Sequence, residues 1–153
     1  MRCCVAFLVV ALVTLVSCKR DALLYVYNPV DSEGWSRQDT LSFDIDSVPV
    51  SGMYTISLGL RFTDRMPYRQ ISLVLEQRLY DTGDIFTLRC DTLNMFLSDS
   101  LSRWKAQGNS LYGREDIVRA AQLVQGQHIE WRVYHIMIPS MVPGITDVGL
   151  KVE

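Results

Sequence analysis

The chain has few cysteines and no excess of basic charge. Three of its four cysteines lie in the first 18 residues, which leaves Cys90 alone in the rest of the chain. A folded part with one cysteine cannot hold an internal disulfide, and we expect Cys90 to be a small buried apolar residue. The formal net charge is −2. Nucleic-acid binders normally carry a basic excess or patch, so no nucleic-acid partner is expected.

Patterns typical of metal sites and catalytic centres are also lacking. The only histidines, His128 and His135, are seven residues apart on one expected strand, and an odd separation places them on opposite faces. Residues 108–113 form a glycine-flanked stretch one residue longer than the G-x-S-x-G turn of serine hydrolases. Asp44 and Asp46 alternate with apolar residues, which indicates the solvated face of a half-buried strand. We therefore expect no metal site, no cofactor and no enzymatic activity.

A long apolar run is present at the N-terminus. Residues 5–16 are apolar apart from Thr14, and they follow the basic Arg2. A run of this kind behind a positive charge is typical of a secretory signal. It is shorter than the roughly 20 apolar residues that a transmembrane helix needs. The sequence therefore predicts a cleaved signal peptide.

The apolar run ends in Leu-Val-Ser-Cys at residues 15–18, which resembles a bacterial lipobox. In that pattern the small residue, here Ser17, lets a membrane peptidase cleave ahead of the cysteine, and the thiol of Cys18 carries a diacylglyceryl group. Each buried methylene contributes about 0.8 kcal/mol, so two or three acyl chains hold a protein firmly on a membrane. The alternatives are an ordinary cleaved signal and a short N-terminal helix. The expected organisation is a signal peptide at 1–17, a lipidated tether at 18–21 and one folded domain at 22–153.

Alternating apolar and polar residues predict a series of β-strands. The clearest alternation runs from residue 54 to residue 63, and period two over this length indicates a half-buried strand. Turn residues, such as Asp-Thr-Gly-Asp at 81–84, separate the runs. Further strands are expected at 22–27, 40–46, 70–80, 85–97, 128–138 and 145–152. The pattern predicts an all-β fold, a single-domain antiparallel β-sandwich of jelly-roll type.

Aromatic residues in expected loops are the candidates for binding. Residues 98–115 form the longest irregular stretch, and 116–124 fit either a short helix or a strand. Trp35 lies in an earlier loop, and Trp104 and Tyr112 lie in the long stretch. Tryptophan is enriched in binding hot spots, so these three residues are possible contacts for a partner protein or a glycan. The alternative is that both tryptophans fold back over the ends of the core.

The last eleven residues, Pro-Gly-Ile-Thr-Asp-Val-Gly-Leu-Lys-Val-Glu at 143–153, resemble the closing motif of the gliding-motility lipoprotein GldH family of Bacteroidota. The lipobox at Cys18, Gly-Trp-Ser at 34–36 and Met-Pro-Tyr at 66–68 resemble that family in the same order. Within the closing motif, Gly149 in a terminal strand suggests a bulge or a close approach of another group to the backbone.

The resemblance implies an envelope lipoprotein without known catalysis, needed for gliding and linked to type IX secretion. We therefore expect an outer-membrane lipoprotein that faces the periplasm in preference to the cell surface. We expect it to act as a non-catalytic accessory or scaffold with envelope protein partners. The alternative is a carbohydrate-binding lipoprotein of a polysaccharide-uptake system. That alternative requires Trp35 and Trp104 to be exposed on one face, whereas an accessory protein requires an exposed apolar patch.

Overall fold

The computed structural model describes residues 22–82, 85–98 and 111–153, and within these ranges the chain forms strands and turns but no helix. Among the described residues there is consequently no helix that is long and apolar enough to cross a membrane. The strands are β1 (Leu24–Pro29), β2 (Trp35–Ser36), β3 (Leu41–Ile45), β4 (Gly52–Thr63), β5 (Gln70–Thr82), β6 (Ile85–Phe96), β7 (Leu111–Leu123), β8 (His128–His135), β9 (Met141–Val142) and β10 (Ile145–Val152).

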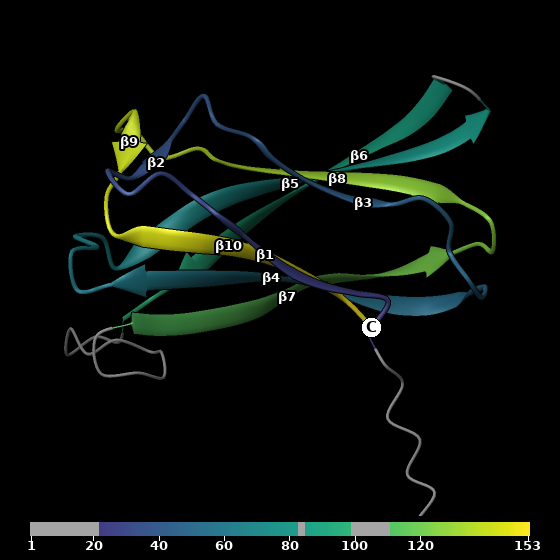
Figure 1. Cartoon of the computed structure of the whole chain (residues 1–153), viewed down its shortest axis with the longest axis horizontal. Helices are drawn as coiled ribbons and strands as arrows, with labels where there is room; N and C mark the ends of the chain where they lie inside the picture. The colour runs from purple at the N-terminus through teal and green to yellow at the C-terminus, as the bar shows by residue number, and fades with distance from the viewer. Residues whose placement is uncertain (1–21, 83–84, 99–110) are drawn as a thin grey trace, which may run out of the picture.

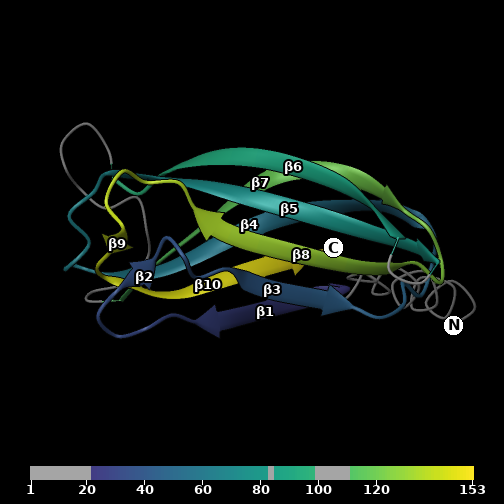
Figure 2. The same ribbon diagram turned by 90° about the horizontal axis from the view of Figure 1, so that it is seen from above.

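Two four-stranded antiparallel sheets lie face to face (Figure 1). Their strand orders are β1-β10-β4-β7 and β3-β8-β5-β6, and a small β2-β9 pair closes one end (Figure 2). Most consecutive strands pass from one sheet to the other, while β5 and β6 are neighbours in one sheet. This arrangement of eight long strands is the jelly roll. The predicted all-β, jelly-roll-like sandwich is confirmed.

The core lies between the two sheets and is formed by alternate residues of each strand. Along β8 the inward residues are fully or almost fully buried and the outward residues are half-buried, as the predicted period of two requires. The largest fully buried side chains include Trp35, Trp131 and Phe62. Burying one large apolar side chain contributes about 1.5–3 kcal/mol to folding.

The structure corrects the prediction for residues 111–115 and decides it for 116–124, while 99–110 lie outside the described residues. β7 begins at Leu111 and pairs with β4 as far as Leu123, so residues 111–115 are not a loop. The pairing shifts by one residue at Val118, where β7 has a bulge. On the two sides of the bulge, Ile117 is exposed and Ala121 is buried. The bulge breaks the period of two, and this is why the segment resembled a helical face.

Gly149 lies under an aromatic ring, which confirms the expected close approach. The ring of Tyr27 covers both Gly149 and its cross-strand partner Gly59, and a Cβ on Gly149 would lie 2.6 Å from ring atoms. Burial raises the pKa of Tyr27 to about 12, so its hydroxyl remains protonated. The bulge of this strand lies nearby, between Ile145 and Asp147.

The two ends of the sandwich differ in what they contain. The antiparallel register brings the starts of β1, β4 and β8 to the same end as the turns at 46–51 and 124–127. We call this the tether end, because the chain runs into β1 from residues 18–21. The far end contains β2, β9 and the loops at 64–69 and 136–140. Figure 1 places the C-terminus toward the tether end, away from β2 and β9.

Candidate protein-docking face

The outer face of the β3-β8-β5-β6 sheet carries the same triplet of side chains on two neighbouring strands. Both β5 and β8 read Glu-x-Arg-x-Tyr, so the three side chains of each triplet alternate along the strand and point to the same face. The triplets are Glu76, Arg78 and Tyr80 on β5, and Glu130, Arg132 and Tyr134 on β8. We call these six residues the Glu-Arg-Tyr ladder.

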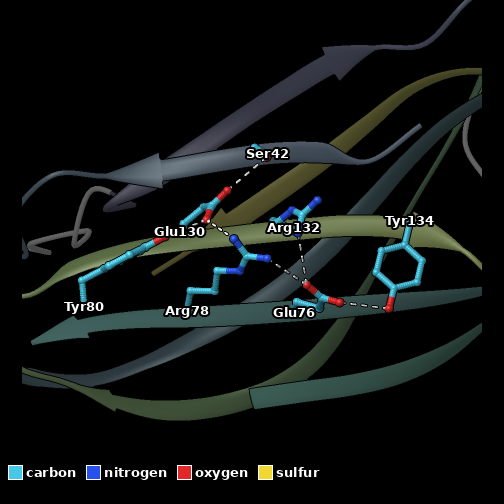
Figure 3. Close-up of polar contacts among 7 residues, drawn as sticks. All are labelled: Ser42, Glu76, Arg78, Tyr80, Glu130, Arg132 and Tyr134. Atoms are coloured by element: carbon cyan, nitrogen blue, oxygen red, sulfur yellow. Dashed lines mark hydrogen bonds and ion pairs between the residues drawn. The ribbon is translucent and has the colours of Figure 1, made fainter. Parts of the chain in front are cut away.

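The antiparallel register pairs each glutamate of the ladder with the arginine of the other strand. Glu76 lies opposite Arg132, and Arg78 lies opposite Glu130. Both pairs form cross-strand ion pairs (Figure 3). Arg78 Nη1 lies 3.2 Å from Glu130 Oε2, and Arg132 Nη1 lies 3.8 Å from Glu76 Oε2. Opposite charges placed directly across a pair of strands stabilise the pairing by roughly 0.2–1 kcal/mol each.

Each tyrosine of the ladder also donates a hydrogen bond to the glutamate of the other strand. The Tyr80 hydroxyl lies 3.1 Å from Glu130 Oε2, and the Tyr134 hydroxyl lies 3.1 Å from Glu76 Oε1 (Figure 3). Burial and the hydrogen bond to Glu76 raise the pKa of Tyr134, which keeps its hydroxyl protonated as a donor. The ladder therefore has an approximate two-fold symmetry, no net charge and side chains that fix one another.

An aromatic cluster continues the ladder toward the tether end. The Tyr80 ring stacks on His128 with centroids 4.6 Å apart, and it contacts Phe86 at 5.4 Å. The guanidinium carbon of Arg78 lies 4.9 Å from the centre of the Phe86 ring. Stacked and tilted aromatic pairs of this kind contribute about 0.5–1.5 kcal/mol beyond their buried area. The cluster connects the ladder to the neighbouring strand β6.

Strand β6 exposes apolar side chains beside the ladder. Among the described residues it is the last strand of its sheet. In its outward row Phe86 and Leu88 are adjacent and exposed, Leu88 at 50%, while the exposed Phe96 is separated from them by Cys90, Thr92 and Asn94. We call Phe86 and Leu88 the β6 strip. An exposed apolar edge strand is prone to associate with other chains. Cys90 belongs to the same outward row and is exposed, so the expectation that it is buried is wrong; it lies opposite the ladder residue Glu76.

An open hollow of about 490 Å³ lies at the far-end side of the ladder. The Arg37 guanidinium holds its rim by donating hydrogen bonds to the carbonyls of Met137 and Ile138. The lining residues are Arg37, Tyr134, His135, Ile136, Met137 and Ile138. Tyr134 therefore belongs both to the ladder and to this hollow.

His135 lies beneath the hollow and is fully buried. Its Nε2 lies 3.1 Å from the Trp35 carbonyl oxygen, and its Nδ1 accepts the N–H of Met137 at 3.3 Å. Burial lowers the pKa of His135, so the ring is neutral and donates through Nε2. His128 lies on the opposite face of β8, as the odd separation of the two histidines predicted.

Of the candidate binding aromatics, Trp35 takes the alternative placement over the end of the core, and Tyr112 lies outside the expected loop. Trp35 is fully buried, packs edge-to-face on His135 with centroids 5.3 Å apart and donates its Nε1–H to the Asp39 carbonyl. It covers the far end of the core, and no ring surface remains for a glycan or a partner. Tyr112 lies in β7 rather than in a loop, half-buried with its ring centroid 5.6 Å from that of Phe62.

The other predicted site residues, Ser17, Cys18 and Trp104, lie outside the described residues. The ladder was not predicted from the sequence. The repeated Glu-x-Arg-x-Tyr at 76–80 and 130–134, on two strands that were both expected, is the signal that points to it.

The profile of a protein family described as GldH lipoprotein matches residues 23–152. A family 35 carbohydrate binding module from Clostridium thermocellum is 13% identical, with 84% of this chain and 89% of that chain covered and a TM-score of 0.38. The Eiger TNF of S. frugiperda is 13% identical, with 87% and 86% covered and a TM-score of 0.32. TM-scores this low indicate neither a ligand nor a partner. The comparison with curated protein sequences found no match. Because the family profile covers nearly the whole described domain, the chain belongs to the GldH lipoprotein family.

Proposed function

We propose that this gliding-motility-associated lipoprotein is a non-catalytic accessory component that binds other envelope proteins through the β6 strip and the adjoining ladder. Its family membership makes it a lipoprotein held on a membrane of the cell envelope. The finer assignment is to the gliding-motility or type IX secretion-linked machinery, with lipid on Cys18. A scaffold of this kind needs a surface that recognises protein rather than a small molecule.

The observation that carries the proposal is the apolar β6 strip on a free strand edge. Phe86 and Leu88 are adjacent and exposed on a strand whose outer edge has no neighbour in its sheet within the part of the chain that the structure describes. Apolar groups that are grouped on a surface and rimmed by polar residues are typical of protein interaction sites. The ladder supplies that polar rim, and its ion pairs are already satisfied internally. A partner can therefore cover the strip without leaving an unpaired charge in the interface.

We also propose that the protein lies on the periplasmic side of the outer membrane. Lys19 directly follows the expected lipidated cysteine, and the next acidic residue is Asp21. An aspartate directly after the cysteine would suggest retention in the inner membrane, and export to the cell surface in this phylum tends to use acidic residues there. Protease digestion of intact and of permeabilised cells tests this placement, because a periplasmic domain is cut only after permeabilisation.

The carbohydrate-binding alternative is not favoured by the described residues. It requires two exposed, roughly coplanar tryptophans, and Trp35 is fully buried. The β6 strip contains phenylalanine and leucine rather than polar groups that could position a sugar. An accessory protein with a protein partner therefore accounts better for the exposed surface.

The test is crosslinking in intact cells followed by affinity purification and mass spectrometry. We expect subunits of the secretion-linked or gliding machinery to be recovered, and to be lost in Cys18→Ala cells. A double variant, Phe86→Glu with Leu88→Glu, removes the strip. Ile117→Glu is the matched control, because Ile117 is an exposed apolar residue on β7, an edge strand of the other sheet. Loss of partners only in the double variant supports the proposal. Unchanged recovery, or recovery of glycan-uptake proteins alone, contradicts it.

A further inference from the structure

We infer that the tether end of the domain rests on the surface of the bilayer that holds its lipid. The contact surface consists of the turns at 46–51 and 124–127 and the first residues of β4, with Val50, Met53 and Val124 exposed at 60%, 58% and 54%. The inference rests on the proposed lipid on Cys18. It adds that the domain has a fixed orientation on the membrane instead of hanging freely from its tether.

The first observation is that the turns lack charge from residue 47 to 51 and from 124 to 127. Other charges do lie at this end: the exposed Glu153 pairs with Lys151, and β5 ends there with Asp81 in its sequence. Residues 47–60 and 120–129 contain no Asp, Glu, Lys or Arg, although 21% of the whole chain is charged. Asp46 is exposed at the rim, immediately before the first of these segments. A surface with about 25–35% charged residues favours solubility. Two turns with little charge and three exposed apolar side chains are instead suited to a lipid interface, where apolar groups are buried at the boundary between headgroups and acyl chains.

The far end is charged in two of its segments. Residues 31–39 carry Asp31, Glu33, Arg37 and Asp39, and residues 64–69 carry Asp64, Arg65 and Arg69, whereas residues 136–146 carry no charge. It exposes apolar side chains as well, including Ile138 at 95%. Exposed apolar residues in an uncharged segment thus occur at both ends, and the nearness of the expected lipid distinguishes the tether end.

The second observation is that the two turns hold each other by hydrogen bonds. The Val48 N–H donates to the Gln127 carbonyl at 3.0 Å, and the Gly126 N–H donates to the Val48 carbonyl at 2.8 Å. The Gln125 N–H donates to Ser51 Oγ at 2.8 Å. Burying an unpaired backbone group costs free energy, and these bonds remove part of that cost. The buried side chain of Val48 fixes the first turn to the core.

The third observation is the length of chain between the expected lipid and the domain. The Leu23 N–H donates to the Val152 carbonyl at 2.7 Å, and Thr55 exchanges hydrogen bonds with Glu153, so the chain enters the domain on β1, with β10 between it and β4. Strands two apart in a sheet lie about 10 Å from each other, and Met53 is a further two residues, about 7 Å, along β4 from Thr55. Cys18 precedes Leu23 by five residues, which span at most about 18 Å. Such a short tether keeps the tether end near the bilayer, whereas Thr63 at the far end of β4 is about 26 Å beyond Thr55.

The experiment uses the full lipidated protein in vesicles of phosphatidylethanolamine and phosphatidylglycerol. In a Cys90→Ser background the lipidated Cys18 has no free thiol, so one new cysteine can be labelled alone with an environment-sensitive fluorophore. The labelled positions are Val50→Cys, Met53→Cys and Val124→Cys, with Ile138→Cys as the far-end control. Flotation with the vesicles and mass spectrometry of the N-terminal peptide establish separately whether the lipid is present.

We expect the three tether-end probes to shift to shorter emission wavelength and to be quenched at least about twofold by lipids that carry a spin-label quencher, while the Ile138→Cys probe stays unquenched. Four unquenched probes on a protein that floats and carries lipid would overturn the inference and leave the anchor intact. Equal quenching at both ends would also overturn it, because the contact would not be specific to the tether end. A protein without lipid would overturn the anchor, and the inference with it.

Discussion

The tether end and the far end of the sandwich are built on different physical principles. At the tether end, uncharged turns are held by hydrogen bonds to each other, and their apolar side chains point outward. At the far end, the segments at 31–39 and 64–69 are charged, the loop at 136–140 is not, and the buried pair of Trp35 and His135 fills the end of the core. A hydrophobic residue at an end of this fold can therefore serve either stability or contact with another surface, and burial distinguishes the two.

The largest expected difference between the ends is in the free energy of unfolding when one side chain is truncated. Trp35→Ala should lower it by about 3–5 kcal/mol, because a fully buried large aromatic is replaced by a cavity. Val124→Ala at the tether end should change it by less than about 0.5 kcal/mol, because Val124 is exposed. Equilibrium denaturation in urea measures both values. Similar losses at the two positions would show that the turns at the tether end are part of the core.

The two histidines provide a pH test of the same comparison. Burial lowers the pKa of His135 below its ordinary value of 6.5, so below about pH 6.5 the unfolded chain binds a proton that the folded chain does not. The free energy of unfolding should therefore fall as the pH decreases from 6.5, by up to about 1.4 kcal/mol per pH unit from this residue. Above that pH the ring is neutral in both states and contributes no pH dependence.

The measurement is denaturation at a series of pH values, and the slope with pH is compared rather than the stability at one pH. His135→Gln should reduce the slope below pH 6.5. His128→Gln is the control, because His128 lies on the outer face at the tether-end start of β8. An unaltered slope in His135→Gln would contradict a neutral buried histidine at the far end.

The ladder between the two ends should contribute less. Its glutamates and arginines are partly exposed, with Glu76 at 18% and Arg132 at 32%. A double-mutant cycle of Glu76→Gln and Arg132→Gln should therefore give a coupling free energy below about 1 kcal/mol. A coupling of several kcal/mol would mean that the ladder holds the sheet together and is not primarily a rigid surface for a partner.

The smallest effect on stability is expected from adding charge at the tether end. Val50→Asp and Val124→Asp should change the free energy of unfolding by less than about 0.5 kcal/mol, since both side chains already face solvent. The same two changes should remove lipid quenching of a probe at Met53→Cys, because a carboxylate is costly to bring into the lipid interface. Retained quenching in the double variant would contradict the proposed contact with the bilayer.

Local pattern was sufficient for most strands. The last strand lies where it was predicted, at residues 145–152, and β8 buries alternate residues as expected. The prediction was wrong for residues 111–115, which belong to β7, and undecided at 116–124, where a bulge at Val118 shifts the alternation by one residue. A bulge is set by the pairing with β4, and the sequence of β7 alone does not contain that pairing.

The candidate site was harder to predict than the fold. Trp35 was a candidate surface contact with burial over the end of the core as the alternative, and the sequence did not decide between them. Its two-residue strand pairs with β9 more than 100 residues later and brings the ring into the core. Cys90 was expected to be buried because it is small and apolar, yet its place in the register puts it on the outer face opposite Glu76. In both cases the partner strand, and not the residue type, decides exposure.

The sequence by itself determined the alternation of the strands, the turns between them, the lipobox pattern and the family resemblance, because each depends on residues close together in the chain. Only the tertiary structure decided which side chains face one another. The two Glu-x-Arg-x-Tyr segments, 54 residues apart, become a ladder because β5 and β8 are neighbours in antiparallel register. The two uncharged turns become one surface because hydrogen bonds join Val48 to Gln127 and Gly126. Pairing between distant segments creates both surfaces, and no local pattern encodes that pairing.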